Sequence, residues 1–397
     1  MKEGWEIKKL GDCFDSIKNG ATIKQERGAI GIPITRIETL SGGNFNRDRL
    51  GYANIESTEK YASFVLDDGD LLLSHINSKT YIGRTVVYNK LEGEEIIHGM
   101  NLLRMKANRN IVSPSYIYYC FKSDLFRIQI ATYRKDAVNQ SSIPVSDLKK
   151  INIPIPPLSE QERIVTELDL ISGVIEKKKQ QLKELDSLAQ SIFYEMFGNP
   201  VENEKGWERE KLSNKAEISS SKRIFASEYT DSGVPFYRGK EVTEKSKGNP
   251  ISVELYISHE RYEEIKLNYG VPDVGDILVT AVGTIGNIWV VDSDDVFYFK
   301  DGNVLWIKIK DGTNPIYFKY ILTILINEYK DMMANGCAYS ALTIANLKEM
   351  PTCVIPLSLQ QEFASKVEKI EKQKELIKQS LAETETLFNS RMDFYFN

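Results

Sequence analysis

The sequence has few of the residues that build metal or disulfide sites. Its 397 residues include only four cysteines and three histidines. These are Cys13, Cys120, Cys337, Cys353, His75, His98 and His259. None of them stands in C-x-x-C or H-E-x-x-H spacing, which is how zinc sites are usually built, and no disulfide framework is indicated. We therefore expect free thiols and no bound metal.

Short motifs of nucleotide-using enzymes are also missing. There is no G-x-x-x-x-G-K-[ST] phosphate loop, no G-x-G-x-x-G fingerprint, and no N-P-P-[YF] tetrapeptide of the kind that adenine methyltransferases carry. E-x-K tripeptides such as Glu264-Ile-Lys266 occur, but a chain with 27% charged residues contains them by chance. A two-site hydrolase, the enzyme alternative, has no constellation to support it. We expect a protein without a catalytic centre of its own.

Long hydrophobic runs are absent as well. No run of about 18 apolar residues could span a bilayer, and the N-terminus lacks the apolar core of a signal peptide, so we expect a cytoplasmic protein. The net charge is −5, but it is unevenly spread. Residues 1–157 contain 22 Lys and Arg against 18 Asp and Glu, whereas residues 199–357 contain 18 against 23. Any affinity for nucleic acid must therefore come from local patches or from a partner.

The chain contains the same pattern twice. GWEIKKL at residues 4–10 returns as GWEREKL at residues 206–212, and DDGDLLLS ending at Ser74 returns as DVGDILVT ending at Thr280. Other matches, including GIPITR with GVPFYR and PLSEQE with PLSLQQ, keep the same order at offsets between 199 and 206. These collinear matches predict a tandem duplication with a period of about half the chain.

Each repeat has two parts. The first alternates short β-rich runs with Gly, Asn and Pro, which predicts a compact mixed α/β domain. The second is a long helix. Ser159 with Glu162, and Ser358 with Gln361, have capping-box spacing at the two helix starts. Gly198 can end the first helix in a left-handed conformation.

Apolar residues recur along both helices in steps of four and three. The expected seam residues are Ile164, Leu168, Ile171, Ile175, Leu182, Leu185, Ile192, Phe363, Val367, Ile370, Ile377, Leu381 and Phe388. Polar residues interrupt the seam at Lys178, Lys374 and Thr384. Spacing of 3.5 residues over about five heptads predicts an antiparallel coiled coil formed by the two helices. The alternative is that each amphipathic helix lies on its own domain.

This order of parts resembles the specificity subunit of Type I restriction-modification enzymes over essentially the whole chain. The resemblance rests on the GW-x4-L domain opening, the G-D-[IL]-L strand, and the P-L-S-x-Q helix start followed by heptads. Each signal is weak alone, but all of them recur twice in the same order. The predicted fold is α+β, with target recognition domains at residues 1–157 and 199–357 and spacer helices at residues 158–198 and 358–397.

The resemblance implies a non-catalytic subunit that binds a bipartite site in double-stranded DNA. It also implies two methyltransferase subunits docked on the chain, joined by translocating restriction subunits. S-adenosylmethionine would belong to the methyltransferase and ATP to the motor, so no cofactor is expected on this chain. One alternative is a related system in which methylation and cleavage share one polypeptide. Another is a coiled-coil scaffold for proteins that does not bind DNA.

Candidate DNA contacts lie on loops, where the two repeats differ in length and sequence. Arg suits guanine, and Asn and Gln suit adenine, because their donors and acceptors match the base edges. In the first repeat the candidates are Arg36, His75, Asn77, Ser78, Lys79, Tyr81, Arg84, Arg134, Lys135, Asn139 and Gln140. In the second repeat they are Arg238, Lys240, Thr280, Thr284, Asn287, Asn335, Tyr339 and Ser340. Any single one can equally be an ordinary solvated side chain, whereas Gly83 and Gly286 are expected to serve turns.

Overall fold

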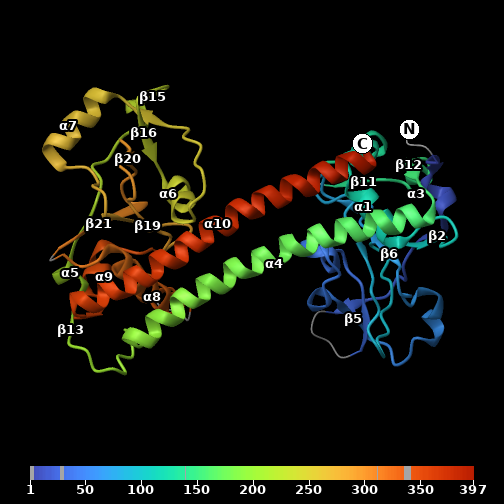
Figure 1. Cartoon of the computed structure of the whole chain (residues 1–397), viewed down its shortest axis with the longest axis horizontal. Coiled ribbons are helices and arrows are strands. Elements are labelled where there is room, and N and C mark those ends of the chain that lie inside the picture. Colours follow the sequence, from blue (N-terminus) through green and yellow to red (C-terminus); the bar gives the residue numbers. More distant parts are fainter. Residues whose placement is uncertain (1–3, 27–30, 139, 311, 335–340) are drawn as a thin grey trace. The chain divides into compact units, whose positions relative to one another are not determined.

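The chain forms two compact units that share two long helices. A computed structural model describes residues 4–26, 31–138, 140–310, 312–334 and 341–397. One unit comprises Met1–Lys179 with Gln379–Asn397, and the other comprises Gln180–Lys378 (Figure 1). Each unit holds one globular domain, called here the first domain (residues 4–157) and the second domain (residues 199–356). Each also holds a stretch of both long helices.

The described residues of the first domain form three sheets of three or four strands and one two-stranded sheet. The largest has the antiparallel order β2-β9-β6-β8, with β2 (Phe14–Asn19), β6 (Leu71–Leu73), β8 (Thr85–Val87) and β9 (Leu103–Ala107). A second joins β3 (Gln25–Glu26), β5 (Gly51–Ala53) and β4 (Ile32–Ile34), and a third joins β10 (Lys135–Asp136), β11 (Ser141–Ser142) and β7 (Ile76–Asn77). Strand β1 (Glu6–Lys9) pairs with β12 (Asn152–Ile155), so the beginning and the end of the domain lie side by side.

Short helices complete the first domain. The α-helices are α1 (Pro114–Lys122), α2 (Asp124–Tyr133) and α3 (Val145–Leu148). The 3-10 helices are η1 (Leu10–Cys13), η2 (Ile37–Gly43), η3 (Arg47–Arg49) and η4 (Glu59–Phe64). Helix α2 starts where the Ser123 hydroxyl accepts a hydrogen bond from the Phe126 amide at 3.2 Å, as an N-cap residue does.

The second domain repeats the framework of the first. Its largest sheet has the equivalent order β14-β21-β18-β19, with β14 (Ala216–Ser220), β18 (Ile277–Thr280), β19 (Ile288–Val290) and β21 (Val304–Ile309). The second sheet joins β15 (Tyr229–Thr230), β17 (Tyr256–Ile257), β16 (Val234–Tyr237) and β20 (Tyr298–Phe299). Strand β13 (Arg209–Lys211) pairs with β22 (Pro351–Cys353), as β1 pairs with β12. Two mixed domains in tandem are thus confirmed.

The helices of the second domain differ more from those of the first. They are α5 (Leu212–Lys215), η5 (Ala226–Glu228), α6 (Gly239–Ser246), α7 (His259–Tyr269), α8 (Pro315–Ala334) and α9 (Ile344–Glu349). The single helix α8 stands where the first domain has the pair α1 and α2. Between β16 and β18 the second domain has the regular α-helices α6 and α7, whereas the first domain has the 3-10 helices η2, η3 and η4 between β4 and β6.

The strands β6 and β18 of the two large sheets are buried on both faces. Leu71 and Leu73 pack on helix α1 through Tyr116, Ile117 and Cys120, whereas the intervening Leu72 packs on the opposite face with Leu40, Val86 and Tyr88. Successive side chains of a strand point to opposite faces, so a strand that is covered on both sides is a continuous apolar run. This is why the DLLLS and DILVT runs do not alternate with polar residues.

The long helices are α4 (Leu158–Phe197) and α10 (Leu357–Phe396), against the expected 158–198 and 358–397. Each has 40 residues, about 60 Å at 1.5 Å per residue. They run antiparallel: Glu167 pairs with Arg391 in the first unit, and Asp186 with Lys374 at 2.7 Å in the second. All thirteen predicted seam residues are buried or partly buried. The antiparallel coiled coil is therefore confirmed.

Polar groups within the seam find partners in the opposite helix. The Lys178 ammonium donates to the carbonyl and hydroxyl of Ser380 and to the Thr384 hydroxyl, at 2.7–2.8 Å. Three donors are thereby matched by three acceptors, which suits a lysine held in a mostly apolar seam. Both helices also reach the domain cores, since Phe193 and Phe363 pack in the second domain and Tyr395 and Phe396 in the first.

The predicted capping boxes are wrong. Both helices begin one residue before the expected serine, and the Pro157 carbonyl accepts hydrogen bonds from the Glu160 and Gln161 amides. Ser159 and Ser358 therefore lie inside the first turn. The end of α4 is as expected, because Gly198 follows it with a φ of 73°.

Candidate functional site

The strand of the G-D-[IL]-L motif, β6 or β18, precedes a loop that contains predicted DNA contacts. In both repeats a buried aspartate anchors this strand. The Asp70 carboxylate accepts from the Asp67 amide at 2.8 Å and from Nε of Arg104 at 2.6 Å. The Asp276 carboxylate accepts from the Asp273 amide at 3.0 Å and from Nε1 of Trp306 at 2.8 Å. Burial raises the pKa of both carboxyl groups. The aspartate of the G-D-[IL]-L motif thus ties its strand to the neighbouring strand.

The loop itself closes through a glycine in both repeats. Gly83 and Gly286 have φ of 81° and 86°, and their amides donate to the carbonyls of Ser74 and Thr280 at 2.8 Å. A Cβ on Gly286 would lie 2.7 Å from the Ile326 side chain. A left-handed backbone favours glycine, so the expected role of both glycines in turns is confirmed.

In the first domain, predicted contacts at residues 77–79 lie beside predicted contacts at residues 134–135. Strand β11 pairs with β7, which places Ser141 opposite Asn77, and it also pairs with β10. Asp136 of β10 then accepts from the Lys79 ammonium at 3.0 Å, from Nε of Arg134 at 2.7 Å and from the Ser141 hydroxyl at 2.6 Å. These donors, Arg134 first, hold the pKa of Asp136 well below its usual range.

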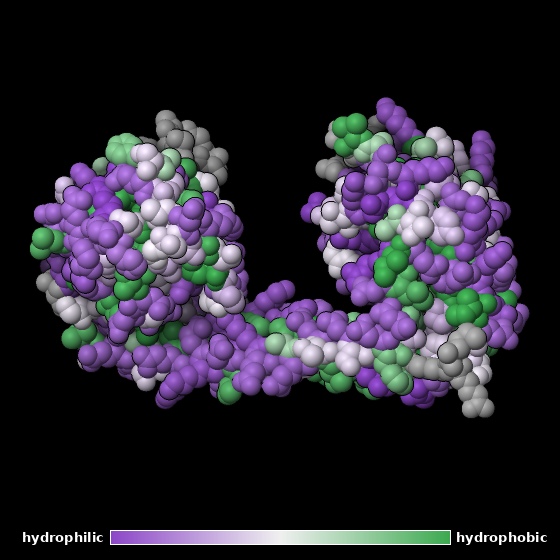
Figure 2. Space-filling view, turned by 90° about the horizontal axis from the view of Figure 1, so that it is seen from above, coloured by the Kyte–Doolittle hydropathy of each residue, from purple (hydrophilic) through white to green (hydrophobic). Residues whose placement is uncertain are grey.

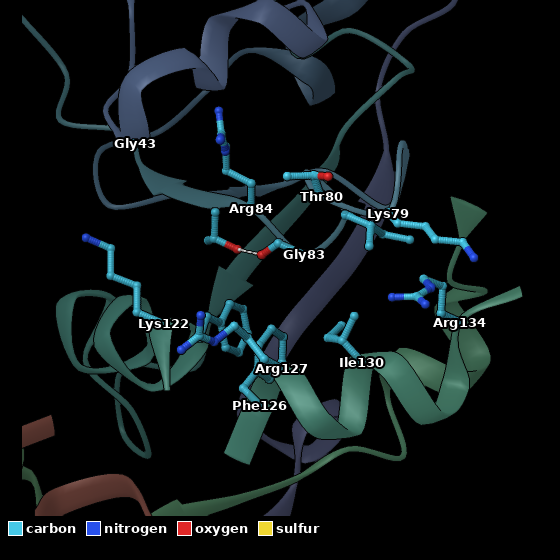
Figure 3. Close-up of a pocket in the computed structure, with 13 residues that line it drawn as sticks. Gly43, Lys79, Thr80, Gly83, Arg84, Lys122, Phe126, Arg127, Ile130 and Arg134 are labelled. Atoms are coloured by element: carbon cyan, nitrogen blue, oxygen red, sulfur yellow. Dashed lines mark hydrogen bonds between the residues drawn. The ribbon is translucent and has the colours of Figure 1, made fainter. Parts of the chain in front are cut away.

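Next to Asp136 and its three donors lies a cavity of about 400 Å³ with a positively charged rim. Figure 3 shows Lys79 and Arg134 on one side, and Arg84, Lys122 and Arg127 on the other. Its lining residues are Gly43, Lys79, Thr80, Ile82, Gly83, Arg84, Thr85, Phe121, Lys122, Phe126, Arg127, Ile130 and Arg134. They come from η2, the loop before β8, and the helices α1 and α2. Among the residues that the structure describes, five cations and no carboxylate line the cavity.

Other predicted residues of the first domain lie elsewhere. His75 is 5% exposed and burial lowers its pKa, so its ring faces the interior and not solvent. The Asn77 side chain donates to the Ser74 hydroxyl at 3.1 Å and accepts from the Ser78 amide at 2.8 Å. Arg36 lines a separate cavity with Arg47 and Arg49. The exposed candidates outside the cavity include Ser78, Tyr81 and Gln140, and also Lys135 of β10.

The second domain presents a more neutral surface at its candidate loop. Asn287 donates from Nδ2 to the Thr243 hydroxyl at 3.0 Å, and Thr280 donates to the Thr284 carbonyl. Its predicted cations are occupied, because Arg238 and Lys240 both pair with Glu254, at 2.8 and 2.6 Å. Asn139, Asn335, Tyr339 and Ser340 lie outside the described residues.

Two groups of residues were not anticipated. Lys122 and Arg127 were not among the candidates, because the candidates were sought on loops and these two residues lie in helices α1 and α2. The second group is Gln161 and Gln360, which are the glutamines of the two P-L-S-x-Q motifs. Gln161 accepts from the Ser113 amide at 2.8 Å and donates to the Ile111 and Pro156 carbonyls. Gln360 accepts from the Asn314 amide at 2.9 Å and donates to the Ile355 carbonyl. The two glutamines therefore make equivalent hydrogen bonds in the two repeats.

Among the described residues, no cluster of three His, Cys, Asp or Glu side chains is arranged to hold a metal ion. None of the helices in that part of the chain is long and apolar enough to cross a membrane.

Comparison with known proteins places these features in context. The family model described as "Type I restriction modification DNA specificity domain" matches residues 2–187 and again residues 204–386. The putative Type I restriction enzyme MjaX specificity subunit of Methanocaldococcus jannaschii is 30% identical over 94% of this chain and 88% of its own. The EcoKI specificity subunit of Escherichia coli K12 is 28% identical over 46% of this chain and 41% of its own. A crystal structure of an S subunit from M. genitalium matches with a TM-score of 0.55 and 14% identity, covering 100% of this chain and 98% of that one.

Proposed function

Because the chain belongs to the family of Type I restriction-modification specificity subunits, which recognise DNA without catalysing its modification, we propose that it binds a bipartite DNA site. Each domain would read one half of the site. The observation that carries this proposal is that one sheet framework occurs twice with loops that differ in charge and hydrogen bonding. A rigid framework that presents variable loops is the usual arrangement for recognition.

The helix pair supports the proposal that other subunits dock on this chain. Leu170, Leu188, Leu376 and Leu387 of the two helices are 46–68% exposed. In the second unit, Leu185, Leu188, Leu376 and Ile377 line a cavity of about 520 Å³. On the face that Figure 2 shows, hydrophilic residues dominate and apolar residues gather in patches. Exposed apolar residues within a hydrophilic surface are typical of protein interfaces.

The proposed partners are methyltransferase subunits, two per chain, and restriction subunits with translocase activity. S-adenosylmethionine would be bound by the methyltransferase and ATP by the translocase, so this chain would hold no cofactor. The complex would act in the cytoplasm. A system in which methylation and cleavage share one polypeptide is the nearest alternative, and the genes beside this one distinguish the two.

Replacement of the first domain tests the division into half-sites. Residues 1–157 would be exchanged for the equivalent domain of another specificity subunit, and methylated positions would be mapped in the host genome. We expect one half of the methylated motif to change while the other half and the spacer stay the same. A simultaneous change in both halves contradicts the proposal.

Insertion of one heptad into both helices tests their role as a spacer. A ruler made of two paired helices should lengthen the gap between the half-sites and leave each half-site intact. The methylated motif again provides the measurement. If the spacer between the half-sites keeps its length, the helices do not set that length.

DNA binding separates this proposal from the scaffold alternative. The chain, purified with its methyltransferase subunits, would be titrated with a pool of random duplexes at several salt concentrations. We expect binding that weakens as salt rises, because DNA phosphates release counterions when a protein binds them. No binding at low salt would favour a scaffold for proteins only.

A further inference from the structure

The cavity of the first domain carries more positive charge than its neighbours balance. Of its five cations, Lys79 and Arg134 share Asp136, and Arg127 pairs with Asp124. Within the part of the chain that the structure describes, no carboxylate lies within ion-pair distance of Arg84 or Lys122. These two side chains are therefore the excess charge of the cavity.

Aromatic rings hold both of these cations in place. The Arg84 guanidinium lies 4.5 Å from the centroid of the Tyr81 ring, and its Nη1 donates to the Leu40 carbonyl at 3.4 Å. The Lys122 ammonium lies 4.0 Å from the centroid of the Tyr118 ring. A cation over an aromatic face keeps most of its N–H donors available for another acceptor. Both side chains are thus ordered and still able to bind an anion.

Two further cations of the cavity, Lys79 and Arg134, are balanced by the partly exposed carboxylate of Asp136. Asp136 is 37% exposed and Lys79 is 64% exposed, so their ion pair is weak. The carboxylate of Asp136 accepts from an ammonium, a guanidinium and a hydroxyl, which are the same donors that a phosphate oxygen would use. Asp136 therefore forms ion pairs with Lys79 and Arg134 in the unbound chain.

Among the residues that the structure describes, the corresponding place in the second domain carries less positive charge. Gly286 and Ile326 stand where the first domain has Gly83 and Ile130, and the nearby cation is Lys330. The residues around that turn, Thr243, Thr280 and Asn287, bond to one another as neutral groups. A cationic rim is thus a property of the first domain's turn and not of the framework.

Resting on the proposed function, we infer that this cavity seats a backbone phosphate of duplex DNA. Arg84 and Lys122 make its main contacts, and Asp136 competes with DNA for Lys79 and Arg134. The apolar floor formed by Ile82 and Ile130 suits the deoxyribose next to the phosphate. The first domain would then supply most of the salt-dependent affinity, whereas the second would contribute through neutral hydrogen bonds.

The test uses the full chain purified with its methyltransferase subunits and a pool of random duplexes, measured by fluorescence anisotropy at 50 to 200 mM salt, the range over which phosphate contacts change affinity most. Each phosphate contact contributes about 0.9 to the slope of log affinity against log salt. The double variant Arg84→Gln with Lys122→Gln should therefore bind more weakly, with a slope shallower by about 1.8. The matched control is Lys149→Gln with Lys150→Gln, two cations of the same domain that do not line the cavity.

A variant with the opposite effect keeps the inference testable if the first one fails to fold. Asp136→Asn frees Lys79 and Arg134, so it should tighten binding to random duplexes and steepen the slope. Asp147→Asn, a partly buried carboxylate paired with Lys150, removes the same charge away from the cavity and should change little. In a background with Lys79→Ala and Arg134→Ala, the effect of Asp136→Asn should disappear.

The outcomes separate the inference from the function on which it rests. If the wild type binds duplexes but the cavity variants behave like their controls, the phosphate site is wrong and the DNA-binding function stands. A wild type that does not bind duplexes overturns both. Titration with inorganic pyrophosphate distinguishes DNA from free phosphate: saturable binding that the double variant loses, with duplex binding unchanged, would overturn the assignment to the DNA backbone.

Discussion

The two recognition domains each contain a large sheet of the same strand order, but the loops beside the two sheets present different surfaces. Both place a buried aspartate before the loop, Asp70 or Asp276, and both close the loop through a glycine with positive φ. The first domain has five cations around the cavity beside its loop, whereas the described residues around the loop of the second domain are threonine and asparagine with Lys330 nearby. Duplication therefore kept the residues that fix the backbone and left the exposed side chains free to diverge. The predictions below compare equivalent positions in the two domains.

The largest difference is expected at the buried aspartates. Substitution of either aspartate by alanine leaves a backbone amide unpaired, that of Asp67 or Asp273. Asp70→Ala also leaves the buried guanidinium of Arg104 without its main partner, whereas Asp276→Ala leaves the neutral indole of Trp306. Breaking a buried ion pair costs about 3–5 kcal/mol, and leaving a neutral donor unpaired costs about 1–3 kcal/mol. Hydrogen exchange of peptides from each domain gives the two opening free energies separately. Equal losses would show that the partner's charge does not matter, and Glu92→Ala, on an exposed loop, serves as the control.

Acid is expected to destabilise the first domain before the second. Burial lowers the pKa of His98 to about 4, whereas His259 of the second domain is exposed. A histidine with a depressed pKa binds protons better in the unfolded chain, so its contribution to stability is complete above about pH 6.5 and is lost as pH falls towards 4. A shift of this size corresponds to about 3 kcal/mol.

The pH dependence of hydrogen exchange checks this prediction. Peptides of the first domain should lose protection between pH 6.5 and 4, and His98→Gln should reduce that loss. His259→Gln, the control, should leave exchange in the second domain unchanged. Equal acid sensitivity of both domains, retained in His98→Gln, contradicts the role of this histidine.

A smaller effect, equal in both domains, is expected at the helix starts. Gln161→Ala and Gln360→Ala remove buried side chains that join each long helix to the loop before α1 or α8. Each should cost about 1–3 kcal/mol, because buried backbone groups lose their partners. Thermal melting of the full chain measures both. The controls are Glu162→Ala and Gln361→Ala, the exposed residues of the expected capping boxes; if they cost as much, the capping box is the true helix start.

The smallest effects are expected at single recognition residues. Asn77→Ala and Asn287→Ala should each relax one base preference, in the first and second half-site respectively. We expect a loss of discrimination of about 1 kcal/mol, at the low end for a base contact, because each amide already makes local hydrogen bonds. Competition binding with every single-base variant of the mapped site measures this. If either variant weakens all sequences equally, that residue contacts phosphate and not a base.

Much of the architecture could be predicted from the sequence because it rests on patterns that repeat along the chain. Two copies of GW, G-D-[IL]-L and P-L-S-x-Q indicated two equivalent domains, and apolar residues at heptad spacing indicated the antiparallel helix pair. Burial of Ile164, Leu168 and Phe363 follows from that spacing alone, because residues three and four apart share one face of a helix. Local chemistry was harder to assign, as the helix starts show, since Pro157 and Gln161 take the roles expected of Ser159 and Glu162.

Only the tertiary structure decided which side chains meet. Lys79 and Arg134 are 55 residues apart in the sequence, and they share Asp136 because β7, β11 and β10 pair. Lys122 and Arg127 line the same cavity because α1 and α2 pack beside the Gly83 turn. His75 is only four residues from Lys79 in the sequence, but its side chain is buried in the interior. Periodic burial is encoded locally and can be predicted from spacing. The composition of a surface depends on long-range pairing and on side-chain direction, which a single sequence does not specify.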